Sequence, residues 1–105
     1  MDFTLLSPED AHNMLNEDKN ILLIDVRSNE EYNEGHIAGS ISMPLDVIDE
    51  DILREVGDKN KKILLYCKSG RRSKIAAEKL RDLGYTNIFV LDGGINNWNY
   101  GLSSN

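Results

Sequence analysis

Short apolar runs alternate with stretches of helical spacing along the whole chain. Residues 21–26 form a continuous apolar run of strand length, a pattern typical of a strand that is covered on both faces. The run at 40–44 is weaker, and Pro44 disfavours any extension of it. In total the pattern predicts five strands, within residues 3–6, 21–26, 40–44, 62–67 and 87–91.

Helices are predicted between these strands. Ser7 has the properties of an N-cap residue, with Pro8 at the first helical position. Gly57 and Gly84 follow apolar residues at helical spacing and predict two helix ends. The expected helices cover residues 8–16, 45–56 and 71–83, with a short helix within 28–40 and a final helix or turn from Gly93. The last four residues, 102–105, are expected to form a loose tail.

Strands separated by helices indicate an α/β domain with a mostly parallel sheet between two helical layers. The length predicts a single domain over residues 1–105. The hydrophobic fraction of 40% and the charged fraction of 29% are typical of a soluble globular protein. No apolar run approaches the roughly 18 residues that would suggest a membrane span. The first ten residues lack the pattern of an export signal, so a cytoplasmic location is expected.

The balance of charges and the cysteine count narrow the possible functions. A formal net charge of −6 disfavours a nucleic-acid partner, because phosphate binding depends on clustered Lys and Arg. One local cluster of cations, formed by Lys68, Arg71, Arg72 and Lys74, instead indicates a site for a small anion. The single cysteine cannot form an internal disulfide, and with two histidines it does not make a convincing zinc site. A lone free thiol is typical of a reducing compartment.

The cysteine closes the apolar run at 62–67 and precedes the helix predicted from Arg71. A helix start leaves backbone N–H groups free, and with the helix dipole these groups form an anion site. Gly70 allows a tight turn, and Arg71 and Arg72 add guanidinium donors. Such surroundings lower the pKa of a thiol, and the thiolate is the nucleophile. A lone cysteine is often a small core residue, but a core residue does not need cations in the next turn, so we interpret Cys67 as a nucleophile.

Three segments of the chain resemble the rhodanese family of single-domain sulfurtransferases. Residues 24–44 resemble its stretch of Asp-x-Arg, Glu-Tyr, Gly-His-Ile and Pro. Residues 64–73 resemble its active-site strand and loop, and residues 90–98 resemble its closing Gly-Gly and Trp segment. The resemblance covers most of the chain and implies a three-layer α/β/α rhodanese-like fold with a mainly parallel five-stranded sheet.

The resemblance also implies an activity and a set of site residues. Cys67 would be catalytic, taking sulfane sulfur from a small anionic donor such as thiosulfate and carrying it as a persulfide. The acceptor would be cyanide or a thiol, with thioredoxin and glutathione as candidates, and no cofactor, metal, nucleic acid or membrane is expected. The expected substrate-binding residues are Lys68, Ser69, Gly70, Arg71, Arg72 and Ser73. Asp25, Arg27 and Gly93 are expected to be structural: an ion pair at the end of a strand, and a tight turn that lets the last segment approach the active loop.

Two other interpretations are kept beside this one. The cell-cycle phosphatases and arsenate reductases have a related fold, and their loop has five residues between Cys and Arg. Here four residues separate Cys67 from Arg72, and the shorter loop favours sulfur over a tetrahedral phosphate. The second alternative is a non-catalytic rhodanese-like module that binds a partner or senses oxidants, since a low-pKa thiol also suits a redox sensor. The cationic loop around Cys67 favours an active enzyme over such a module.

Overall fold

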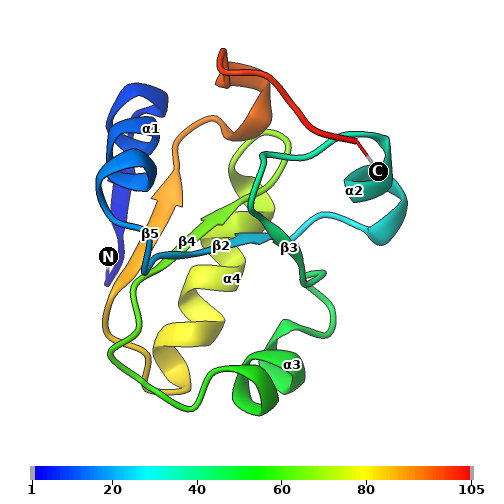
Figure 1. Ribbon diagram of the computed structural model, residues 1–105. Coiled ribbons are helices and arrows are strands. Elements are labelled where there is room, and N and C mark those ends of the chain that lie inside the picture. Colours follow the sequence, from blue (N-terminus) through cyan, green and yellow to red (C-terminus); the bar gives the residue numbers. More distant parts are fainter. Residues whose placement is uncertain (1, 105) are drawn as a thin grey trace.

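Five strands form one sheet in the computed structural model, which describes residues 2–104 (Figure 1). They are β1 (Thr4–Leu6), β2 (Leu22–Asp25), β3 (Ile41–Ser42), β4 (Ile63–Tyr66) and β5 (Ile88–Leu91). Their order across the sheet is β1-β5-β4-β2-β3, and all four neighbouring pairs are parallel. The five predicted strands and the predicted α/β class are confirmed.

Two layers of helices cover the sheet. The helices are α1 (Pro8–Glu17), α2 (Asn29–Glu34), α3 (Ile48–Glu55), α4 (Arg71–Asp82) and the 3-10 helix η1 (Gly94–Asn97). Residues of α1 and η1 pack on one face, and α3 and α4 pack on the other (Figure 1). The predicted cap of α1 is present, because the N–H of Asp10 donates to Oγ of Ser7 at 3.1 Å. The three layers agree with the expected α/β/α architecture.

The central strand β4 leads directly into the loop that contains Cys67, at the carboxyl ends of the strands. All its residues are buried; Leu64 packs toward α1, and Leu65 packs toward α3 and α4. Its neighbours are β5 and β2, and Asp25 of β2 is paired with Tyr66 at the carboxyl ends of their two strands. The segments that follow β2 and β4 therefore meet at the carboxyl-terminal end of the sheet, where open parallel sheets bind their ligands.

The prediction of a loose tail over 102–105 is wrong for its described part. The N–H of His36 donates to the carbonyl of Ser103 at 2.8 Å, and the N–H of Ser103 donates back at 2.7 Å. Leu102 lies beside Gly35. This antiparallel bridge satisfies backbone groups that follow α2, which explains why the tail is held. Asn105 lies outside the described residues.

None of the helices within residues 2–104 combines the length and the apolar composition that a passage through a lipid bilayer would require.

Candidate active site

The loop between β4 and α4 contains the single thiol of the chain. Cys67 follows the buried Tyr66 at the end of β4, and α4 begins at Arg71. Gly70 precedes α4 with φ 102°, a left-handed conformation that favours glycine. This turn reverses the chain, so that N–H groups at the start of α4 point back toward the cysteine.

The Cys67 sulfur lies inside this loop and accepts hydrogen bonds from it. The N–H of Gly70 donates to Sγ at 3.0 Å, and the N–H of Ser73 donates at 3.4 Å. Oγ of Ser73 lies 3.5 Å from the sulfur and 3.0 Å from the carbonyl oxygen of Gly70. A hydroxyl has one proton, so it donates fully to only one of these acceptors, and a negative sulfur competes for that proton better than a neutral one.

These contacts decide the ionisation of the thiol. Cys67 is 1% exposed and packs among the aliphatic residues on the α3–α4 side of the sheet. Burial raises the pKa of Cys67, but the hydroxyl of Ser73 and the N–H groups of Ser73, Gly70 and Ser69 lower it, and the net shift is downward. The cysteine is therefore a core residue by its exposure and a candidate nucleophile by its hydrogen bonds.

The three cations of the loop have different surroundings. Lys68 and Arg71 are exposed, and neither forms an ion pair within residues 2–104. Arg72 instead donates two hydrogen bonds to Glu31 of α2, with Nη1–Oε1 at 2.8 Å and Nη2–Oε2 at 3.1 Å. This pair lowers the pKa of Glu31 to about 2. The predicted contact of Arg72 with a donor anion stays a prediction, because in the structure its guanidinium is bound to Glu31.

An ion pair at the end of β2 lies beside the loop. Nη2 of Arg27 is 2.7 Å from Oδ2 of Asp25, and the two side chains are 5% and 0% exposed. Arg27 also donates to the carbonyl oxygen of Gly35 at 2.7 Å. The ion pair predicted from the sequence is therefore present, and it joins the end of β2 to the end of α2.

Two glycines, Gly93 and Gly94, bring the last segment onto the active loop. The N–H of Ile95 donates to the carbonyl oxygen of Cys67 at 3.0 Å. A Cβ atom on Gly94 would lie 2.5 Å from the carbonyl oxygen of Lys68, and its φ is +62°. No other residue type permits both this conformation and this approach, so the predicted role of the turn is confirmed.

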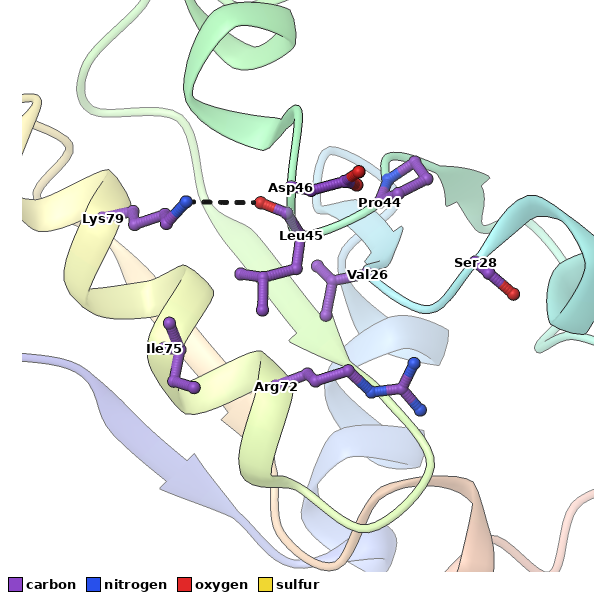
Figure 2. A pocket seen from close by; sticks show the side chains of 8 residues that line it. All are labelled: Val26, Ser28, Pro44, Leu45, Asp46, Arg72, Ile75 and Lys79. Carbon is purple, nitrogen blue, oxygen red and sulfur yellow. Dashed lines mark hydrogen bonds between the residues drawn. The ribbon is translucent and has the colours of Figure 1, made fainter.

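Two pockets border the loop. The larger has a volume of about 470 Å³, lies between α4 and the segment after β3, and includes Arg72 of the loop (Figure 2). Its other lining residues are Val26, Ser28, Pro44, Leu45, Asp46, Ile75 and Lys79. The smaller has a volume of about 290 Å³ and is lined by Arg27, Glu31, Glu34, Gly35, Lys68, Ile95 and Leu102. Cys67 itself lines neither pocket. Its sequence neighbour Lys68 lines the smaller pocket, whereas Val26 and Leu45, which belong to the aliphatic cluster around Cys67, line the larger one.

Sequence reasoning did not identify Glu31 and Glu34 as part of this region. The pattern Ser28-x-x-Glu31 is a capping box, visible in the sequence, and the structure confirms it at the start of α2. That pattern marks a helix start but does not reveal which distant side chain the carboxylate reaches, and Arg72 is 41 positions away. Among the described residues, no group of three or more His, Cys, Asp and Glu side chains is arranged to hold a metal ion.

Comparison with known proteins identifies relatives of this chain. The sequence model of the rhodanese-like domain family matches residues 7–100 of this chain. The Thiosulfate sulfurtransferase PspE of Escherichia coli (strain K12) is 43% identical over 65 residues, which are 62% of this chain and 62% of that protein. The tRNA uridine(34) hydroxylase of Buchnera aphidicola is 35% identical in an alignment of 96 residues that covers 88% of this chain but 30% of that protein. The chain thus spans less than two thirds of the length of each of these relatives.

Solved structures agree with the family match. The rhodanese-like domain protein of Staphylococcus aureus is 29% identical, with a TM-score of 0.86 over 98% of this chain and 99% of that chain. A structure described as rhodanese with anions from E. coli is 35% identical, with a TM-score of 0.73 over 81% of this chain and 99% of that chain.

Proposed function

Since the chain belongs to the rhodanese-like domain family, a family of sulfurtransferases, we propose that Cys67 takes sulfane sulfur from thiosulfate or a similar donor and passes it to cyanide or a thiol. The observation that carries this proposal is the sulfur held by the N–H groups of Gly70 and Ser73 at the start of α4. That geometry favours a thiolate in a buried place, and the thiolate is the form that attacks.

In the first half-reaction, the Cys67 thiolate attacks the outer sulfur of thiosulfate. A new S–S bond forms to the cysteine, and the bond between the outer sulfur and the sulfite group breaks with its electron pair, so that sulfite leaves as a dianion. The persulfide left on Cys67 carries the negative charge, which N–H groups of the loop and the positive end of α4 stabilise. Lys68 and Arg71 at the rim attract the anionic donor.

In the second half-reaction, a nucleophile attacks the outer sulfur of the persulfide. The S–S bond breaks, its electron pair returns to the Cys67 sulfur, and the thiolate is restored. With cyanide the product is thiocyanate, and with a thiolate it is a hydropersulfide. The balance of atoms and charges needs no external oxidant or reductant, and one covalent intermediate divides the transfer into two steps.

The test is sulfur loading measured by mass spectrometry of the intact protein. Incubation with thiosulfate should add the mass of one sulfur atom, and cyanide should remove it as thiocyanate. Cys67→Ser should neither load nor produce thiocyanate; unchanged turnover by this variant would exclude Cys67 as the nucleophile. Hydrolysis of an aryl phosphate by the wild type would instead support the phosphatase interpretation. A mixed disulfide with glutathione, with no loading by thiosulfate, would support the redox-sensing module.

Hydroxylation of tRNA uridine is the activity named for several relatives, and it is a weaker candidate for this chain. The matched region is 30% of the Buchnera protein, so most of that protein has no counterpart in the 105 residues. The net charge of −6 also disfavours tRNA binding. A gel-shift measurement with tRNA tests this expectation directly, and tight binding at moderate salt would contradict it.

A further inference from the structure

One cation of the active loop shares the surroundings of the thiol. Arg72 lies between Gly70 and Ser73, whose N–H groups donate to the Cys67 sulfur. Its side chain lines the larger pocket beside Val26, a member of the aliphatic cluster that also contains Cys67 (Figure 2). The guanidinium therefore contributes to the charge that an anion meets at this site.

Glu31 holds this guanidinium with a carboxylate that is itself fixed. Its Oε1 atom accepts hydrogen bonds from the N–H and from Oγ of Ser28, both at 3.1 Å, in the capping box that begins α2. The hydrogen bonds to Glu31 raise the pKa of Arg72, and the charge of Cys67 adds to this shift. A capping box needs an oxygen acceptor but no charge, since Gln serves in it as well as Glu. The charge of Glu31 is therefore available to act on Arg72.

The pair leaves Arg72 with free donors but little net charge. A guanidinium has five N–H groups, and Glu31 accepts from one on each terminal nitrogen. No other acceptor between residues 2 and 104 binds this side chain. The remaining N–H groups can therefore still bind an oxyanion, while the carboxylate offsets the positive charge behind them.

An unmatched guanidinium would strengthen the binding of every dianion at the loop. Thiosulfate would be bound more tightly, but so would inert dianions such as sulfate, and so would sulfite, which has to leave before the acceptor attacks. Binding that is equally strong for substrate and product does not speed a reaction. A cation whose charge is partly cancelled therefore suits a site that must release an anion in every cycle.

We propose that Glu31 is a positioning residue that fixes the Arg72 guanidinium and limits the positive charge that it presents, so that sulfite is released and inert dianions are not retained. Lys68 and Arg71, which have no such partner among the described residues, attract the donor from a distance. This inference rests on the proposed sulfurtransferase activity and adds a residue that governs which anions the site holds.

Glu31→Gln tests the charge alone, because Gln can keep the capping box. The variant should raise kcat/KM for thiosulfate and strengthen competitive inhibition by sulfate, each about two- to fivefold, the effect of a partly exposed ion pair. Arg72→Gln should change both values in the opposite direction. In the Arg72→Gln background, Glu31→Gln should do no more than Glu30→Gln does, which a double-mutant cycle measures.

Alkylation of Cys67, the only thiol of the chain, reports the same charge without any sulfur transfer. The ratio of the rate constants for iodoacetate, an anion, and for neutral iodoacetamide cancels the nucleophilicity of the thiol. Glu31→Gln should raise this ratio about two- to fivefold, and Arg72→Gln should lower it. A purely structural role of Glu31 would change both rate constants alike and leave the ratio unchanged.

Glu30→Gln is the matched control, because it removes the same charge from the preceding, exposed position of α2. Glu30 forms no ion pair in the part of the chain that the structure describes. Equal effects of the two Gln variants, or a lowered alkylation ratio in Glu31→Gln, would overturn the proposed role. Absence of sulfur loading by the wild type would contradict the sulfurtransferase itself, whereas normal loading with an unchanged ratio in Glu31→Gln would contradict only the role of Glu31.

Discussion

At the scale of single residues, two opposing influences act on the Cys67 sulfur. Burial alone would hold the thiol neutral, and four hydrogen-bond donors from three neighbouring residues favour the thiolate. The hydroxyl of Ser73 is the one donor among them that a substitution can remove while the backbone stays in place. The sulfur is therefore tuned by a side chain six positions away along the chain.

Ser73→Ala should raise the pKa of Cys67, because it removes a donor to the thiolate and keeps the Ser73 backbone N–H. A group with a lowered pKa is ionised above that pKa, so the variant should need a higher pH to reach the same thiolate fraction. The pH profile of sulfur loading should therefore shift to higher pH. Absorbance of the thiolate near 240 nm, titrated against pH, measures the change.

Ser69→Ala is the matched control for this titration. Ser69 acts on the sulfur through its backbone N–H, which the substitution preserves, so the pKa of Cys67 should stay close to that of the wild type. An identical titration for Ser73→Ala and wild type would show that the hydroxyl does not contribute to ionisation. Cys67→Ser supplies the baseline, because it removes the only thiol of the chain.

The hydrogen-bond donors around Cys67 could be predicted from the sequence because the features that create them are local. A strand end, a glycine and a helix start within a few positions place N–H groups near the sulfur in almost any folded arrangement. The partner of Arg72 could not be predicted in this way. The sequence shows two adjacent arginines, and only the packing of α2 against the loop distinguishes the paired Arg72 from the exposed Arg71.

At the scale of elements, the docking of η1 on the active loop depends on a backbone contact. Gly94 lies against backbone atoms of Cys67 and Lys68, and backbone atoms cannot move aside as the end of a flexible side chain can. The contact therefore fixes the loop from the side opposite to α4. Apolar runs and helical spacing predicted the strands and the helices α1, α3 and α4. The short helix α2 was expected from a polar segment, and η1 and its contact with the loop were indicated only by a pair of glycines.

Gly94→Ala should destabilise the protein by about 3 kcal/mol, combining a left-handed alanine with an overlap against the loop backbone. Gly39→Ala is the matched control: its φ of +86° is similarly unfavourable for alanine, but a Cβ there meets no atom within 4 Å among the residues described. It should cost about 1 kcal/mol. Chemical denaturation measures both values, and equal losses would show that the close approach of Gly94 contributes nothing.

At the scale of the whole molecule, the two ends of the site are joined by the last segment of the chain. Ile95 is hydrogen-bonded to the active loop, and Ser103 is paired with His36 just after α2 (Figure 1). Leu102, between them, lines the smaller pocket. The segment from η1 to Ser103 therefore forms one wall of the smaller pocket, a role that the short sequence 102–105 does not suggest. Its pairing is made by backbone atoms, and backbone pairing of a short segment leaves no periodic pattern to recognise.

Ending the chain after Gly101 should lower the free energy of unfolding by about 1–2 kcal/mol, since two buried backbone hydrogen bonds to His36 are lost and each contributes about 1 kcal/mol. A chain ending after Ser104 is the control, because it keeps the bridge formed by Ser103. Hydrogen exchange at the His36 amide should be fast in the shorter chain and protected in the longer one. Equal protection of the His36 amide in the two chains would contradict the bridge.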